Sequence, residues 1–152
     1  MSSDAPEPTR KRSSEDRLRP HPAERFALPQ HAFDLHETAR ELKAEQVAAP
    51  NKGHRQKTLY RHGKATVALF VFNAGAGLVE HQAAGTVTIH VIDGRMHIRA
   101  ADSEHVFGPG GLLILAPNVE HDVHAIEDSI MLLRVHLERT SRSHAAARLR
   151  GS

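Results

Sequence analysis

Apolar and polar residues alternate with a period of two along much of the second half of the chain. In the segment 87–91 the odd positions are apolar, and the segment 95–99 alternates in the same way, with Met96 and Ile98 as its apolar positions. Successive side chains of a β-strand point to opposite faces of a sheet. The pattern therefore predicts strands that each bury one face.

Period-two segments and short apolar runs, separated by Gly, Asn and Asp, predict nine strands in all. The predicted strands are Lys57 to Arg61, Thr66 to Asn73, Gly77 to Gln82, Val87 to Ile92, Arg95 to Ala100, Ser103 to Phe107, Leu112 to Leu115, Asp122 to Ile126 and Ser129 to Leu137. Asp93-Gly94 and Ala101-Asp102 are the predicted hairpin turns. So many short strands are typical of an all-β sandwich or barrel, in which an antiparallel set closes its edges.

One short helix is predicted ahead of the strands. The residues 34–37 form a capping box in which the Asp34 carboxylate accepts the backbone amide of Glu37. Apolar residues then follow at helical spacing, at Leu35, Ala39 and Leu42. These features predict a helix over 35–47 that ends before the proline at position 50.

The chain divides into four predicted segments. Residues 1–30 are rich in proline, serine and mixed charge, a composition that buries too little apolar surface to offset chain entropy, and we expect a disordered leader. The helix and a connecting segment occupy 31–57, and the β-barrel occupies 58–138. Residues 139–152 form a disordered basic tail.

Charge and composition exclude several classes of function. The chain has no cysteine, which excludes disulfides and zinc–thiolate sites. Its formal net charge is +2, yet residues 31–138 hold 10 Lys and Arg against 13 Asp and Glu, a net charge of −3, so the basic excess lies at the ends. Because those ends lack interleaved aromatic residues, we do not expect nucleic-acid binding. No apolar run reaches a membrane-spanning length of about 20 residues or resembles a secretory signal, so we expect a cytoplasmic protein.

Two spaced motifs resemble those of the cupin superfamily, whose fold is a double-stranded β-helix, or jelly-roll barrel. The family's first motif runs Gly, five residues, His-x-His, three or four residues, Glu, six residues, Gly. Gly75, His81 and Gly94 fall at that spacing. The second motif runs Gly, five residues, Pro-x-Gly, two residues, His, three residues, Asn, and Gly110 and His121 match it.

The chain departs from both motifs at positions that matter for chemistry. Ala83 and Val87 stand where the first motif has its second His and its Glu, and Ala116 and Ala125 stand at the Pro and Asn places of the second. Asn118 replaces a glycine, but asparagine tolerates a positive φ, so the turn should survive. Of the three His and one Glu that the resemblance implies as metal ligands, only His81 and His121 are retained.

The predicted site is the interior of the barrel. Two imidazoles are fewer than the three protein ligands of typical catalytic metal sites, although a divalent Fe, Mn, Ni or Zn ion held by His81 and His121 stays open as an alternative. The ligand-binding residues that we predict are His81, Ala83, Val87, Ile89, Met96, His121 and Val123, with Leu113 also bounding the barrel. We expect the remaining histidines on the surface or the rim, namely His54, His62, His90, His97, His105, His124, His136 and His144.

The favoured function is a non-catalytic binding or sensing module that holds a small polar ligand in the barrel. The alternative is a metal-dependent cupin enzyme, such as an oxygenase, isomerase or decarboxylase, and a third interpretation is a dimeric structural protein with an empty barrel. The sequence has no phosphate-binding loop and no Gly-x-Ser-x-Gly elbow, which argues against phosphoryl transfer and serine hydrolysis. We also expect a homodimer, because a jelly-roll sheet leaves edge strands that must be covered.

Overall fold

The computed structural model describes residues 26, 28–45 and 53–138. The predicted leader, apart from residues 26 and 28–30, and the predicted basic tail lie outside the described residues. The described residues from Ala32 onward belong to one compact unit of the chain. None of the helices in this described part has the length and apolar character needed to cross a bilayer.

The helix forms where the capping box predicts it. Helix α2 spans Leu35–Ala44, and the Asp34 carboxylate accepts a hydrogen bond from the amide of Glu37 at 3.0 Å. The cap satisfies one of the amides that have no partner within the first turn of a helix. The helix ends three residues earlier than predicted, because Glu45 already has an extended backbone.

The nine predicted strands are all present, with bounds that shift by up to three residues. They are β1 (His54–His62), β2 (Ala65–Phe72), β3 (Gly77–His81), β4 (Gly85–Asp93), β5 (Met96–Ala100), β6 (Ser103–Phe107), β7 (Leu112–Leu115), β8 (His121–Ala125) and β9 (Ser129–Leu137). The largest difference is at β1, which begins at His54 rather than at Lys57. The predicted all-β jelly-roll fold is confirmed.

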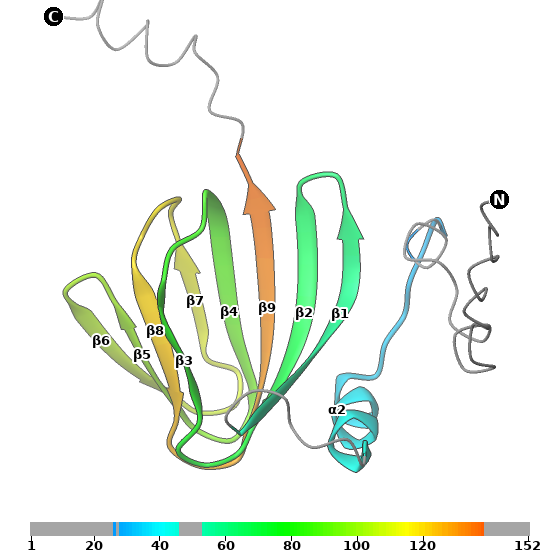
Figure 1. Cartoon of the computed structure of the whole chain (residues 1–152), viewed down its shortest axis with the longest axis horizontal. Helices are drawn as coiled ribbons and strands as arrows, with labels where there is room; N and C mark the ends of the chain where they lie inside the picture. Colours follow the sequence, from blue (N-terminus) through cyan, green and yellow to red (C-terminus); the bar gives the residue numbers. More distant parts are fainter. Residues whose placement is uncertain (1–25, 27, 46–52, 139–152) are drawn as a thin grey trace, which may run out of the picture. The chain divides into compact units, whose positions relative to one another are not determined.

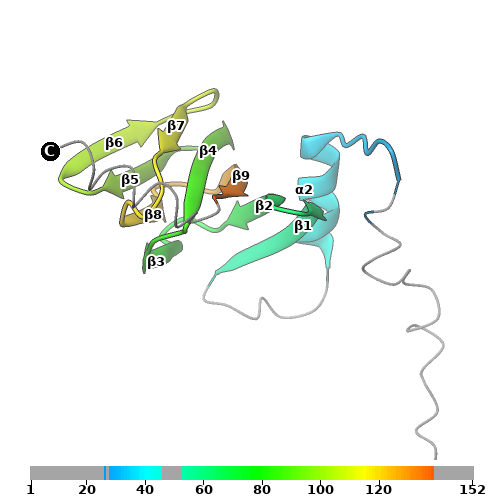
Figure 2. The same cartoon turned by 90° about the horizontal axis from the view of Figure 1, so that it is seen from above.

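The strands form two antiparallel sheets (Figure 1). The large sheet has the order β1-β2-β9-β4-β7, and the small sheet has the order β3-β8-β5-β6. Seen from above, the two sheets lie as opposite walls of the barrel, and α2 lies against β1 and β2 on the outside of the large sheet (Figure 2). Strands far apart in the sequence are therefore neighbours, such as β4 and β9.

The inward faces of both sheets make the main core. On β4 the buried positions are the odd ones that the alternation predicted, Val87, Ile89 and Val91, and on β5 they include Met96 and Ile98. Burial of these apolar side chains between the two sheets is the main stabilising contribution, at about 25 cal/mol per Å² of apolar surface removed from water.

A second core lies on the outer face of the large sheet. Ala39 and Leu42 of α2 pack against a cluster that includes Leu69, Val71 and Leu132. This second layer explains why residues 68–72 of β2 are buried without interruption, since alternate side chains face the two different cores.

The predicted turns adopt the backbone geometry that their residues favour. Gly94 has a φ of +84°, and Asn118, at a glycine place of the cupin motif, has a φ of +64°. Both angles lie in the left-handed region that glycine and asparagine tolerate best. The hairpin turn at Ala101 is less expected, because alanine adopts a φ of +51° there.

One histidine prediction is wrong. His54 is only 9% exposed, and its ring lies 5.6 Å from the ring of Phe72 and 6.1 Å from that of Phe70. The reason is that β1 starts at His54, so pairing of His54 with Phe72 brings its ring among the aromatic side chains of β2. By contrast His62, His124 and His136 are exposed, and His90, His97 and His105 are half-buried, while His144 lies outside the described residues.

Candidate functional site

Two neighbouring strands of the small sheet bring His81 and His121 together. The two residues are direct cross-strand partners in the pairing of β3 with β8, and their ring centroids are 4.2 Å apart. The two histidines are 40 positions apart in the sequence, so only the sheet makes them neighbours.

A β-bulge in β3 gives His81 its orientation. Leu78 pairs with Val123 and His81 pairs with His121, so Val79 and Glu80 lie opposite Asp122 alone. An extra residue on one strand shifts the alternation by one position. Both Leu78 and His81 can then share the face of Val123 and His121, although three positions separate them.

Each imidazole makes the same kind of contact with a backbone carbonyl. Nδ1 of His81 lies 2.9 Å from the carbonyl oxygen of Val79, and Nδ1 of His121 lies 2.9 Å from that of Val119. A carbonyl oxygen can only accept, so each Nδ1 is the donor and each Nε2 is the free ring nitrogen.

The two rings differ in their access to solvent. The side chain of His81 is exposed at the end of the barrel, whereas His121 is 2% exposed. Nε2 of His121 is buried and has no hydrogen-bond partner in the described part of the chain. A buried polar atom without a partner is rare in folded proteins and calls for an explanation, such as an ordered water or a bound ion.

Burial lowers the pKa of His121 below its usual value, and the neighbouring His81 lowers it further. The hydrogen bond to the carbonyl of Val119 and the negative charge of Asp122 oppose this change. The net lowering favours a neutral ring at neutral pH, with a lone pair on Nε2.

The apolar residues predicted to bind a ligand lie in the inner core. Val87, Ile89, Met96 and Val123 are all at most 3% exposed and pack in one cluster. Ala83 and Leu113 are half-buried against that cluster. The carbonyl of Ala83 accepts a hydrogen bond of 2.8 Å from the amide of Asn118, which ties the two motifs together beside the histidine pair.

The residues at the pair do not complete a metal centre. Their orientation suits metal ligands, since metal-bound histidines usually donate the other ring N–H to a carbonyl or carboxylate. However, no group of three or more His, Cys, Asp or Glu side chains that could hold a metal occurs in residues 26, 28–45 and 53–138. Ala83 and Val87 stand where the first motif has its second His and its Glu, and their side chains carry no atom that could bind a metal.

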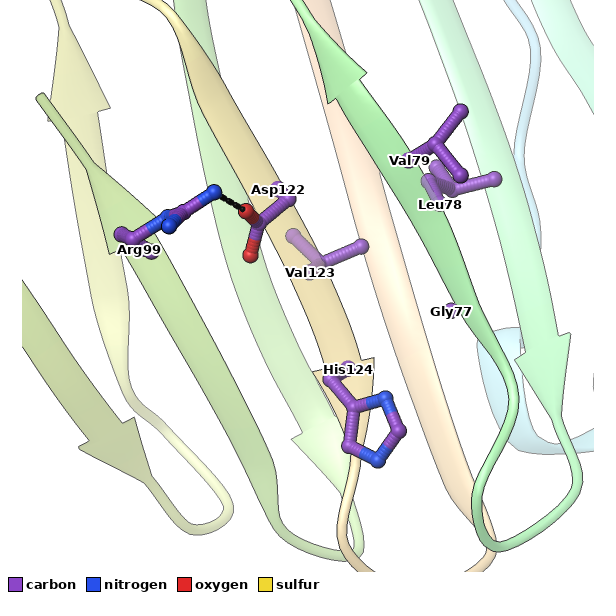
Figure 3. Close-up of a pocket in the computed structure, with 7 residues that line it drawn as sticks. All are labelled: Gly77, Leu78, Val79, Arg99, Asp122, Val123 and His124. Carbon is purple, nitrogen blue, oxygen red and sulfur yellow. Dashed lines mark ion pairs between the residues drawn. The ribbon is translucent and has the colours of Figure 1, made fainter.

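A shallow pocket on the outside of the small sheet was not expected from the sequence. It has a volume of about 380 Å³ and lies over β3, β8 and β5 (Figure 3). Its lining residues are Gly77, Leu78, Val79, Arg99, Asp122, Val123 and His124. Arg99 and Asp122 form an ion pair of 2.7 Å across the strands. The alternation places these two residues on outward faces, but only the pairing of β5 with β8 reveals that they meet.

No protein-family model matches the sequence, and no curated protein matches it either. Solved structures with the same fold do exist. A conserved protein of unknown function from Streptococcus pyogenes superposes with a TM-score of 0.59 at 19% identity, covering 72% of this chain and 90% of that one.

Two further structures carry names that describe their fold or activity. A cupin superfamily protein from Desulfitobacterium hafniense superposes with a TM-score of 0.56 at 17% identity, covering 60% of this chain and 84% of that one. Salicylate 1,2-dioxygenase from Pseudoaminobacter salicylatoxidans, solved as adducts with gentisate, gives a TM-score of 0.60 at 12% identity, covering 68% of this chain and 32% of that one. At these identities the likeness establishes the fold, and this chain has the double-stranded β-helix fold of the cupin superfamily.

Proposed function

We propose that this protein binds a small polar molecule at the end of its barrel, through His81 and His121, and acts as a binding or sensing module. The observation that carries the proposal is the buried Nε2 atom of His121, which has no partner in the described part of the chain. Leaving such an atom unsatisfied costs about 1 to 3 kcal/mol, and a group that bonds to it removes part of that cost.

The surroundings of the pair support a small-molecule site. Val87 and Val123 belong to the inner core cluster and Ala83 packs against it; Val123 lies two positions after His121 on β8, and Ala83 two positions after His81. Small-molecule sites are usually apolar concavities with a few well-placed polar groups. The two imidazoles next to this apolar core would supply the polar groups of such a site.

A metal-dependent enzyme is the second candidate, and the orientation of the two imidazoles favours it. Each Nδ1 contacts a carbonyl oxygen and leaves Nε2 free, as in histidines that bind Fe, Mn, Ni or Zn. Its weakness is the ligand count, because the pair offers two donor atoms where catalytic sites commonly use three.

Native mass spectrometry together with elemental analysis of the purified full-length protein separates these functions. We expect a bound small molecule without stoichiometric metal in the wild type, and its loss in His81→Ala and His121→Ala. His124→Ala is the matched control, since His124 lies on the same strand as His121 but is exposed. A stoichiometric metal that disappears in His81→Ala would support the enzyme instead, and absence of both would support a structural protein with an empty barrel.

We further propose that the protein is cytoplasmic and forms a homodimer through strand β7. β7 ends the large sheet, so one side of its backbone has no neighbouring strand within the described sheet. Its outward side chains Leu112 and Ile114 are 49% and 62% exposed. An exposed apolar edge strand is a template for pairing with a second copy.

A further inference from the structure

We propose that the histidine pair selects ligands that donate a hydrogen bond, such as neutral alcohols and phenols, and discriminates against carboxylates. This inference rests on the proposed small-molecule site and names the chemical class that the site accepts. It follows from which ring nitrogen carries the proton in each imidazole, and from the groups that surround the pair.

The hydrogen bonds of the two rings determine what they offer to a ligand. Both Nδ1 atoms point to backbone carbonyl oxygens at 2.9 Å, those of Val79 and Val119. Since a carbonyl cannot donate, both Nδ1 atoms carry hydrogen, and a neutral imidazole has only one N–H. Each Nε2 therefore presents a lone pair, so both histidines can accept a hydrogen bond from a ligand.

At His121, burial limits the partners that Nε2 can find to groups that donate a hydrogen bond. Its side chain is 2% exposed and its Nε2 is unpartnered within the described residues, so a group that reaches it must supply the hydrogen. The ring of His81 is only 4.2 Å away, centroid to centroid, and is accessible from solvent. A hydroxyl that bonds to Nε2 of His121 would therefore have a second imidazole nearby.

Among the described residues, the charges nearest to the pair compensate each other and supply no cation for an anionic ligand. Asp122 follows His121 directly in β8, and its negative charge acts on the ring of His121. The guanidinium of Arg99 lies on the outer face of the sheet and forms an ion pair with Asp122 at 2.7 Å. Because Arg99 compensates the charge of Asp122, the lone pairs of the two Nε2 atoms are the main groups that oppose a carboxylate, whereas a hydroxyl would form a bond to one of them.

The test uses phenol, anisole and benzoate, three probes of similar size that differ in their polar group. Phenol can donate a hydrogen bond, anisole cannot, and benzoate is an anion. Full-length 15N-labelled protein, treated with a chelator, is titrated with each probe at pH 7.5 while the imidazole nitrogens are followed by long-range 1H–15N NMR. We expect the Nδ1–H form for both histidines before ligand is added. Phenol should then shift Nε2 of His121 in a saturable way, at least about tenfold more tightly than anisole or benzoate, which is about 1.4 kcal/mol.

Controls make the outcome specific to the pair. His121→Phe should abolish the saturable response to phenol, and His124→Gln should retain it, because His124 is exposed on the same strand. Circular dichroism and melting curves establish that both variants are folded.

Three results would overturn the inference: an Nε2–H form in the ligand-free protein, binding of anisole or benzoate as tight as that of phenol, or no saturable response to phenol, which would leave water as the partner of Nε2. None of these results removes the proposed function, which fails only if native mass spectrometry finds no molecule whose retention depends on His81 and His121.

Discussion

Burial separates the histidines of this chain into groups with different chemistry. His121 is buried with a free Nε2 beside a second imidazole, whereas His54 is buried beside the rings of Phe70 and Phe72 with an unpartnered Nδ1 in the described structure. His124, on the same strand as His121, is exposed. The residue type is the same in each case, so the environment decides whether the ring can serve as a site, a packing element or a surface group.

We expect the free energy of unfolding to decrease as the pH falls below about 6.5. Desolvation by burial lowers the pKa of both His54 and His121 in the folded protein, relative to the usual histidine value of about 6.5. Below about pH 6.5 the unfolded chain binds protons more readily than the folded one, so protonation favours unfolding. The stability present above that pH is therefore lost as the pH falls toward the lowered pKa values of the folded protein. Urea unfolding at pH values between about 5 and 8, a range that brackets the usual histidine pKa, measures how steeply the free energy of unfolding changes with pH.

His54→Phe should reduce the slope, because it removes one of the two buried titrating groups while keeping an aromatic ring against Phe70 and Phe72. His124→Gln, at an exposed position on β8, is the comparison variant. An unaltered slope in His54→Phe would show that His54 does not contribute to the pH dependence.

We expect Gly94→Ala to destabilise the protein by about 2 to 4 kcal/mol, from backbone strain and a steric clash together. Gly94 has a φ of +84°, and a Cβ there would lie 2.3 Å from the carbonyl oxygen of Asp128 and 2.7 Å from Cα of Ser129. Gly110→Ala is the matched control, because Gly110 has a φ of +88° but nothing within 4 Å of its Cβ position. Thermal or urea unfolding should show a larger loss at Gly94, and equal losses would mean that strain alone accounts for both.

At the scale of elements, strand β2 shows how one segment serves two cores. Phe70 and Phe72 face the barrel interior, whereas Leu69 and Val71 face the layer covered by α2. A strand with two buried faces has no polar alternation, which is why this segment appears in the sequence as a continuous apolar run. Helix α2 is therefore part of the folded unit rather than an appendage.

Leu42→Ala should lower the free energy of unfolding by about 2 to 5 kcal/mol, the usual cost of removing a buried leucine side chain. Leu42 is 4% exposed and belongs to the outer cluster with Leu69 and Leu132. The control is Glu41→Ala, an exposed neighbour on the same helix, for which we expect a change within about 0.5 kcal/mol. A similarly small change for Leu42→Ala in chemical denaturation would indicate that α2 does not stabilise the sheet.

At the scale of the whole molecule, the proposed dimer makes a prediction about solution mass. Light scattering at tens of micromolar should give twice the mass of one chain, since an affinity of about 1 μM suffices at that concentration. Ile114→Lys should give a monomer, because it puts a charge on the exposed edge strand β7. Val79→Lys changes a residue that is 86% exposed on β3 and should leave the dimer intact. A monomeric wild type would remove the proposal.

Sequence patterns were sufficient wherever the determinant is local. The alternation of Val87, Ile89 and Val91 determines which face of β4 is buried, and the cap at Asp34 determines where α2 begins. The positive φ of Asn118 follows from its place in the turn between β7 and β8. These features depend on a few consecutive residues, whose steric and hydrogen-bonding preferences are already present in the sequence.

The meeting of His81 and His121 was predicted only through the spacing of the cupin motifs. Simple alternation along β3 would place Leu78 and His81 on opposite faces, and the bulge that reverses this parity has no clear local signal. The burial of His54 and the contact of Arg99 with Asp122 were likewise decided by strand pairing. Such pairings join segments that are distant in the sequence, so they depend on the topology of the two sheets, which a local pattern of side chains does not contain.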